Sequence, residues 1–207
     1  MIACWSCHKE AGPSPFCSAC GELQPARPRD AFQVFDLSPR YHLDLAVLEK
    51  SWRERSKKLH PDKFVRAGAR QRRFALEQTT LLNQAYKELK SPLARAELIL
   101  RSNGYSTPTA EAGKAGAGEK LPLEFYEEVM VDREALDEAK AEGPEAVQAL
   151  ASQVLTRRDA TLAIIDRAFA DWERSGDAAA LGPAEPELAK LRYYARFVDE
   201  VEGRPHD

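Results

Sequence analysis

The sequence predicts an all-α protein with a small metal-binding lobe at its amino end. Apolar residues recur at three- and four-residue steps over most of the chain after about residue 44, which is the period of an amphipathic helix. Glycine and proline interrupt this pattern at a few places and so separate one helix from the next. All four cysteines lie in the first twenty residues. With 207 residues, the chain has room for one domain or two small ones.

The overall composition is ordinary for a protein in aqueous solution. Hydrophobic residues make up 43% and charged residues 30%. The net charge of -3 gives no general case for binding nucleic acid, and no apolar run is long enough to span a bilayer. Because Cys4 follows closely on Met1, there is no room for a signal or transit peptide. We therefore expect a cytoplasmic protein, with an organellar protein already trimmed of its presequence as the alternative.

The cysteines form two Cys-x-x-Cys pairs within a predicted lobe of residues 1–26. The pairs are Cys4 with Cys7 and Cys17 with Cys20. Each pair can present two thiolates from a tight turn, and the glycine- and proline-containing connection can fold back to bring the pairs together. Four thiolates suit tetrahedral zinc, so we predict one structural Zn²⁺ ion whose binding supplies the folding energy of this short segment. Trp5 and Phe16 are expected to form an apolar cap over the site.

Other uses of the cysteines fit the sequence less well. Disulfides are disfavoured in a reducing cytosol. A redox Cys-x-x-Cys normally stands at a helix start beside a βαβ pattern, and the sequence contains no such pattern. A closed site of four thiolates leaves no position for a substrate, so we interpret the site as structural rather than catalytic.

Residues 27–104 predict a short helix followed by a helical hairpin. The short helix covers about residues 32–37 and ends at a serine–proline pair. The first helix of the hairpin is predicted over residues 44–59, with Asp44 as its N-cap, and the second over residues 69–89. The apolar residues that mark these two helices are Leu45, Leu48, Trp52, Leu59, Phe74, Leu81, Leu82, Ala85, Tyr86 and Leu89.

The tripeptide His60, Pro61 and Asp62 stands between the two helices of the hairpin. A proline disfavours helix in the residue before it, so the first helix should end there and present the tripeptide in a loop. Basic residues surround it: Arg53, Arg55, Lys57, Lys58 and Lys63. A cationic helix with a rigid polar tip suits an acidic docking surface on another protein. The alternatives are an ordinary loop and a solvated helix face. No nucleophile, second acid or glycine-rich phosphate loop accompanies the tripeptide, so we predict no enzyme activity.

The second half of the chain predicts a linker and a three-helix bundle. A short helix over about residues 93–100 ends the hairpin region, and residues 105–120 have the composition of a linker. Residues 121–207 follow as the bundle. Its helices are predicted over residues 121–142, 145–175 and 185–201, separated by two glycine–proline breaks.

The first helix of this bundle is acidic along much of its length. Tyr126, Met130, Glu134 and Glu138 follow a four-residue step, so they should line one face with two large apolar groups and then two carboxylates. Such a stripe suits a protein partner that presents hydrophobic and basic groups. The alternative is that Met130 belongs to the core and the acids form a solvated face.

Six segments of the sequence match the pattern of a known family: RDAFQVFDL at 29–37, HPDKF at 60–64, LNQAY at 82–86, PLARAE at 92–97, REALDE at 133–138 and KLRY at 190–193. Through these segments the chain resembles the HscB family of J-type co-chaperones, which act in iron–sulfur cluster assembly. The hairpin is similar to the J-domain, and the Cys-Trp-x-Cys start is similar to the zinc-bearing variant of the family.

This resemblance implies two protein partners. A DnaK- or HscA-type chaperone would be engaged by the tripeptide and the basic helix, which would stimulate its ATPase. An IscU-type scaffold would be bound by the bundle at Tyr126, Glu127, Met130, Val131, Glu134, Glu138 and Tyr193. A homodimer through exposed apolar residues of the bundle is a further partner compatible with the sequence. The alternative functions are a general J-domain co-chaperone for unfolded clients and, more distantly, nucleic-acid binding by the zinc lobe.

Overall fold

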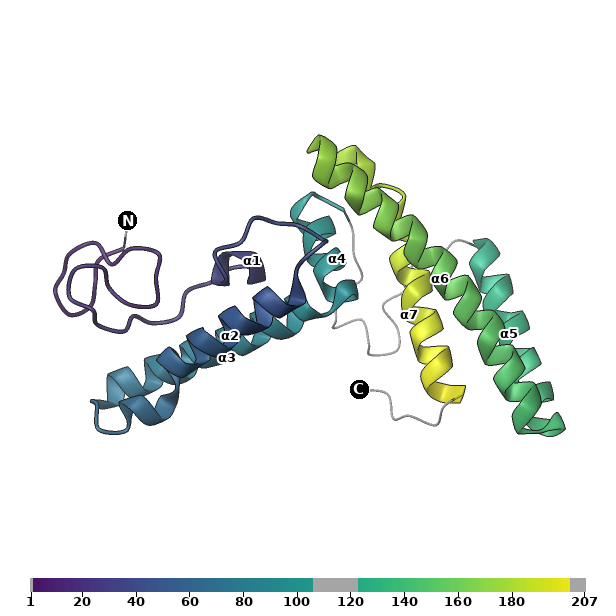
Figure 1. Cartoon of the computed structure of the whole chain (residues 1–207), viewed down its shortest axis with the longest axis horizontal. Helices are drawn as coiled ribbons and strands as arrows, with labels where there is room; N and C mark the ends of the chain where they lie inside the picture. The colour runs from purple at the N-terminus through teal and green to yellow at the C-terminus, as the bar shows by residue number, and fades with distance from the viewer. Residues whose placement is uncertain (1, 106–122, 202–207) are drawn as a thin grey trace. The chain divides into compact units, whose positions relative to one another are not determined.

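The computed structural model describes residues 2–105 and 123–201, which form helices connected by turns, with an irregular lobe at the amino end (Figure 1). Extended pairing within these residues is confined to two isolated bridges, Ala3 with Glu10 and Phe16 with Leu23. The predicted all-α class is therefore confirmed. The predicted linker lies outside the described residues apart from Tyr105. None of the helices in this part of the chain combines the length and the apolar character of a membrane span.

The chain divides into two compact units between Arg95 and Ala96. Helix α4 (Pro92–Ser102) crosses this division, so the predicted end of the hairpin domain at residue 104 stays a prediction. The first unit holds the cysteine lobe together with the hairpin, and the second holds the bundle.

The amino-terminal lobe consists of two similar turns. The N–H of His8 donates to the carbonyl of Cys4 at 3.1 Å, and the N–H of Gly21 donates to the carbonyl of Cys17 at 2.9 Å. The residue that closes each turn has a left-handed backbone, with φ of 60° at His8 and 76° at Gly21. Glycine adopts this conformation freely and other residues do so uncommonly. The turns thus repeat the same local fold around each Cys-x-x-Cys pair.

The hairpin follows as α1 (Ala31–Val34), α2 (Leu45–Leu59), the short 3₁₀ turn η1 (Pro61–Phe64) and α3 (Ala69–Lys90). The Asp44 carboxylate accepts hydrogen bonds from the N–H groups of Ala46 and Val47 at 2.9 and 3.1 Å, which confirms the predicted N-cap. Helices α2 and α3 lie side by side and antiparallel (Figure 1). The residues that the hairpin buries are Ala31, Phe32, Phe35, Leu48, Leu59, Phe74, Ala75, Leu82, Ala85 and Leu89.

Helix α1 is shorter than the sequence predicts. It ends at Val34 rather than near Leu37, because Asp36 adopts a left-handed backbone with φ of 56°. That conformation cannot continue a right-handed helix. The residues after Val34 therefore form a turn, in which Phe35 is buried and Leu37 is exposed.

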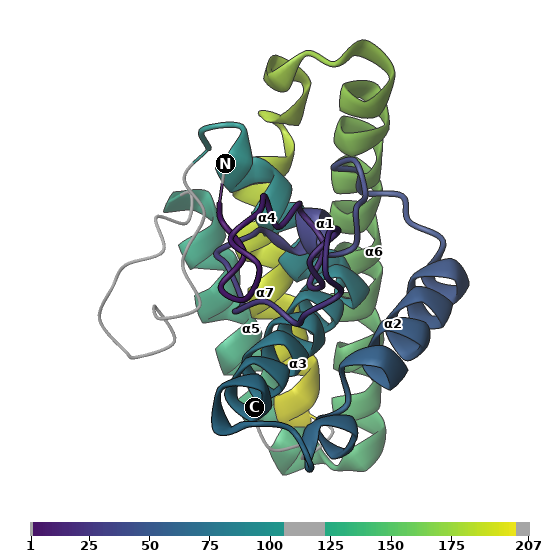
Figure 2. The same ribbon diagram turned by 90° about the vertical axis from the view of Figure 1, so that its left-hand side faces the viewer.

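The second unit is a three-helix bundle formed by α5 (Leu123–Glu142), α6 (Pro144–Ser175) and α7 (Ala184–Val201), with the 3₁₀ turn η3 (Ala178–Leu181) between the last two. Both α5 and α7 pack along α6, as Figures 1 and 2 show from two directions. The breaks fall where glycine allows them: Gly143 has φ of 127° and Gly176 ends α6 with φ of 71°. Its core contains Phe125, Leu136, Val154, Tyr194 and Phe197, and the predicted bundle is confirmed.

Candidate metal centre and docking surfaces

The four cysteines converge on one point within the lobe. Their sulfur atoms all lie within 4.8 Å of one another. The Sγ atoms of Cys4 and Cys20 are 3.7 Å apart, and those of Cys7 and Cys17 are 3.9 Å apart. Four sulfurs bound to one ion by bonds of about 2.3 Å in a tetrahedron stand about 3.8 Å apart. The cysteines are free of disulfides, and their arrangement fits a single tetrahedral metal ion.

The pKa values of the Cys4 and Cys20 thiols also fit a site for a cation. Burial raises the pKa of Cys4, but the backbone N–H groups of Cys7 and Ser6 offset this and bring it down to about 6. The N–H of Glu22 lowers the pKa of Cys20, but burial and the neighbouring sulfurs outweigh it and raise the pKa to about 12. The Cys4 thiolate thus opposes ionisation of the Cys20 thiol. A divalent cation among the sulfurs removes this conflict, because it stabilises all four thiolates.

The metal site is attached to α3. The Gln24 side chain donates to the Cys4 sulfur at 3.3 Å, and the Gln78 side chain of α3 donates to the backbone carbonyl of Gln24 at 3.0 Å. The Trp5 ring packs edge-on against Phe74 of α3, and its indole N–H donates to the carbonyl of Leu23 at 2.7 Å.

The predicted apolar cap over the metal site is therefore wrong. Trp5 belongs to the contact between the lobe and α3 rather than to a lid on the sulfurs. Phe16 lines a cavity of about 330 Å³ between the lobe and the hairpin, together with Leu59 and Leu82. Contact with the hairpin removes part of each aromatic side chain from water, which favours this placement.

The tripeptide projects from the joint of the hairpin. The His60 ring accepts a hydrogen bond at Nδ1 from the N–H of Asp62 at 3.3 Å, and both side chains are largely exposed. The hydroxyl of Thr79 on α3 donates to the carbonyl of Leu59 at 3.1 Å, which fixes the end of α2 immediately before His60. The structure thus holds His60 and Asp62 in place while leaving them accessible.

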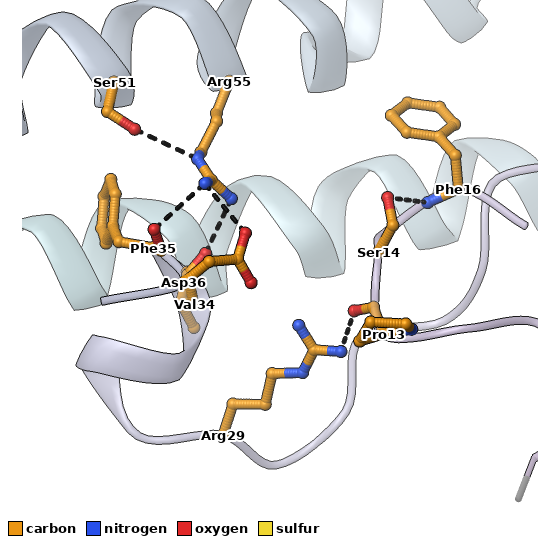
Figure 3. Close-up of polar contacts among 9 residues, drawn as sticks. All are labelled: Pro13, Ser14, Phe16, Arg29, Val34, Phe35, Asp36, Ser51 and Arg55. Atoms are coloured by element: carbon orange, nitrogen blue, oxygen red, sulfur yellow. Dashed lines mark hydrogen bonds and ion pairs between the residues drawn. The ribbon is translucent and has the colours of Figure 1, made fainter. Parts of the chain in front are cut away.

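Four of the five basic residues predicted for docking are exposed: Arg53, Lys57, Lys58 and Lys63. Arg55 differs, because its guanidinium is turned inward (Figure 3). It donates to the carbonyls of Val34 and Phe35 at 2.9 and 3.1 Å and pairs with the Asp36 carboxylate at 3.0 Å. These contacts tie the end of α1 to α2, so the structure gives Arg55 a structural role. Figure 3 also shows Arg29 directed at the carbonyl of Pro13 in the lobe.

The predicted stripe on α5 faces solvent. Met130 is 64% exposed and Val131 62% exposed, so the alternative that Met130 is a core residue is wrong. The remaining α5 residues predicted for scaffold binding are also exposed: Tyr126, Glu127, Glu134 and Glu138. Large apolar side chains rarely lie next to one another on a free surface without a partner. We call these six residues the α5 face.

Tyr193, the seventh predicted scaffold residue, lies on α7 and is half-buried. Its hydroxyl donates to Asp132 at 3.2 Å, and the hydroxyl of Tyr194 donates to Glu128 at 2.9 Å. Arg157 of α6 bridges both carboxylates at 2.6 Å each. Burial raises the pKa of both tyrosines, and the Asp132 and Glu128 carboxylates raise it further.

This network of Glu128, Asp132, Arg157, Tyr193 and Tyr194 joins all three helices of the bundle, and sequence reasoning missed it. Asp132 is only 4% exposed, so its charge requires the partners that it has. The available signal was the four-residue step from Glu128 to Asp132, which places two carboxylates on the same side of α5 as the buried Phe125 and Leu136.

Comparisons with known proteins agree with this architecture. A family model described as the HSCB C-terminal oligomerisation domain matches residues 121–202. The co-chaperone protein HscB homolog of Vibrio vulnificus is 31% identical over 179 residues, covering 83% of this chain and 94% of that protein. The iron-sulfur cluster co-chaperone protein HscB of Mus musculus is 28% identical over 205 residues, covering 96% and 80%.

Two solved structures are similar over most of the chain. The crystal structure of human co-chaperone protein HscB superimposes with a TM-score of 0.80 at 26% identity, covering 97% of each chain. Chaperone HscB from Vibrio cholerae gives a TM-score of 0.68 at 29% identity, covering 84% of this chain and 96% of that one.

Proposed function

The chain belongs to the HscB family of iron–sulfur cluster co-chaperones, and from this premise we propose that it stimulates the ATPase of a DnaK/HscA-type chaperone and delivers an IscU-type scaffold to it. The observation that carries the proposal is the exposure of the α5 face, whose Met130 and Val131 are both more than 60% exposed. An apolar surface with an acidic rim is suited to a protein partner.

The mechanism consists of two coupled binding events. The bundle holds the scaffold, and the J-domain hairpin meets the ATP-bound chaperone through His60, Asp62 and the exposed lysines of α2. Joining both in one chain raises the effective concentration of the scaffold at the chaperone's substrate site. Docking shifts the chaperone toward its hydrolysis-competent state, because the hairpin binds that state more tightly. The chain itself makes and breaks no covalent bond, so it is an activator rather than an enzyme.

We further propose that the ion held by Cys4, Cys7, Cys17 and Cys20 is Zn²⁺. Zinc favours four-coordinate tetrahedral thiolate sites, and a site with four protein ligands is closed to substrate. The distances between the sulfurs support this assignment. When bound, zinc supplies charge neutralisation and a cross-link between the two turns of the lobe. Elemental analysis should find one zinc per chain, and a visible absorption band of a bound iron–sulfur cluster would contradict it.

The hairpin half of the proposal is tested by Asp62→Asn. The Asp62 side chain is 83% exposed and its carboxylate lies 3.4 Å from the ring nitrogen of His60, which is also exposed, so the variant should keep its helical content and its scaffold affinity while ATPase stimulation is lost. Glu10→Gln removes another exposed carboxylate, in the lobe, and should stimulate like the unchanged chain. Steady-state ATP turnover of the partner chaperone is the measurement, and stimulation that survives in Asp62→Asn would contradict the hairpin half of the proposal.

The bundle half is tested by combining Met130→Ala with Glu134→Ala. If these are central anchors, the pair should weaken scaffold binding by more than about 1 kcal/mol. Ile164→Ala is the matched control, because Ile164 is an exposed apolar residue of α6 outside the α5 face. Calorimetric titration of the scaffold gives the affinities. Equal affinity in all three proteins would show that the α5 face is not the scaffold site, and ATPase stimulation without scaffold binding would indicate a general co-chaperone for unfolded clients.

A further inference from the structure

Two buried glutamine side chains connect the metal centre to helix α3. Gln24 is 1% exposed and Gln78 is 8% exposed. A buried amide requires hydrogen-bond partners for its polar groups. The partners available at this contact therefore fix the orientation of both side-chain amides. Both belong to the first compact unit.

The side-chain amide of Gln24 donates both of its N–H groups to acceptors inside the lobe. One goes to the Cys4 sulfur at 3.3 Å and the other to the carbonyl of Glu22 at 2.8 Å. A neutral N–H that points at a thiolate stabilises its charge and restricts where the sulfur can lie. Gln24 therefore acts on a metal ligand without being one, in the way that outer residues orient the ligands of other metal sites.

Gln78 holds the segment that carries Gln24. Its amide donates to two successive carbonyls, those of Gln24 at 3.0 Å and Pro25 at 3.2 Å. Both hydrogen bonds go to adjacent residues of the segment that carries Gln24. This segment therefore cannot move along α3 without breaking both bonds. The path from α3 to the sulfur thus consists of one side chain from the helix and one from the lobe.

We propose that Gln24 and Gln78 are positioning residues that couple the metal centre to α3, so that metal occupancy and the stability of the hairpin depend on each other. The inference rests on the metal site and not on the proposed chaperone activity. A ligand that binds only the folded lobe stabilises whatever is folded with it. The coupling is reciprocal, so a change in α3 that loosens the segment must also weaken the binding of the metal.

Zinc affinity tests the path from the α3 side, where no metal ligand is altered. Gln78→Met keeps the side-chain length but removes both donors, and it should lower the affinity for zinc by about tenfold, the lower end for outer residues of metal sites. Gln71→Met is the matched control: Gln71 also lies on α3 and bonds to the lobe, but through the Glu22 carboxylate. It should change the affinity by less than about twofold. Competition with a chromophoric chelator, with the thiols kept reduced, gives the values.

Gln24→Met tests the same path from the lobe side, with an expected loss of about 10- to 100-fold in zinc affinity. Because this variant could also disturb the fold of the lobe, Gln78→Met decides the question. Unchanged zinc affinity in Gln78→Met, or equal losses in Gln78→Met and Gln71→Met, would overturn the proposed path.

Hydrogen exchange tests the reciprocal effect in the intact chain. Removal of zinc should speed amide exchange in α3 of the unchanged protein, while α6 in the second unit serves as an internal control and should not respond. In Gln78→Met the difference between zinc-loaded and zinc-free α3 should shrink. Exchange in α3 that is the same with and without zinc would refute the coupling, whatever the ATPase assays show.

Discussion

In the amino-terminal lobe the buried apolar cluster consists of Cys4, Ala11 and Cys17, whereas in the bundle it is built from large side chains such as Phe125 and Phe197. Among the described residues of the lobe, this small apolar cluster is too limited to offset the entropy of ordering the backbone. The bundle buries several aromatic and aliphatic groups, each contributing about 1.5–3 kcal/mol. With the proposed ion bound, one chain would combine a region that depends on a single metal site and a region that depends on many distributed contacts.

The comparison shows how each region responds to damage. A metal site is cooperative, so the loss of one ligand removes most of the binding energy of all four. A bundle loses only the contribution of the group that is changed, together with the cost of leaving its partner unsatisfied. Loss of one metal ligand should accordingly unfold the whole lobe, whereas loss of one side chain should lower the stability of the bundle only in part.

The largest expected effect is in the lobe. Cys17→Ala removes one of four ligands from a buried position, and the lobe should lose zinc and its fixed backbone, since structural zinc supplies about 10–16 kcal/mol of apparent folding free energy. Ser18→Ala, at the next, exposed position, should retain one zinc. Metal analysis and hydrogen exchange of residues 2–24 are the measurements. A lobe that stays protected in Cys17→Ala would mean that its apolar contacts suffice, and the contrast with the bundle would disappear.

In the bundle, Arg157→Met should lower the free energy of unfolding by roughly 3 kcal/mol, because it leaves the buried Asp132 carboxylate without its charged partner. The same change at Arg174, also on α6, removes an exposed pair with Asp171 and should cost less than about 1 kcal/mol. Urea unfolding followed by circular dichroism compares the two. Similar costs for both would show that the polar network contributes no more than a surface ion pair.

The smallest effect concerns alkaline pH. The pKa values of Tyr193 and Tyr194 are raised above the ordinary 10.0 in the folded bundle, so their stabilising contribution is complete below that pH and is lost as the pH rises through their folded-state values. The urea midpoint should therefore fall between about pH 9 and about pH 11. Replacing both tyrosines by phenylalanine should reduce this fall, and an identical fall in the double variant would argue against their role.

Much of the fold follows from local pattern. The predicted helices over 44–59, 69–89, 145–175 and 185–201 match α2, α3, α6 and α7 to within a residue or two, because each combines a 3.6-residue apolar period with a capping or breaking residue at its ends. The cysteine spacing likewise predicted that the four sulfur atoms come together, since the two turns that this requires are local.

Most of what the sequence did not predict involves contacts between residues far apart in sequence. Trp5 meets Phe74, and Arg55 meets Asp36; neither pairing has a local signal. Gln24 and Asp132 are polar residues whose burial depends on which helix packs against them. Sequence periodicity indicates whether a residue faces inward or outward, but it does not indicate which distant residue it contacts. The early end of α1 has a different, local cause. Asp36 adopts a left-handed backbone, and its residue type was the only sequence signal for that conformation.

The exposure of Met130 has a chemical consequence beyond recognition. It is one of two methionines in the chain, the other being Met1, and its thioether is open to solvent. Peroxide converts such a side chain to the sulfoxide, which is polar and larger, and which enzymes can reduce again. An oxidant would therefore act directly on the α5 face, and sulfoxide formation at Met130 would replace an apolar group of the proposed scaffold contact by a polar one.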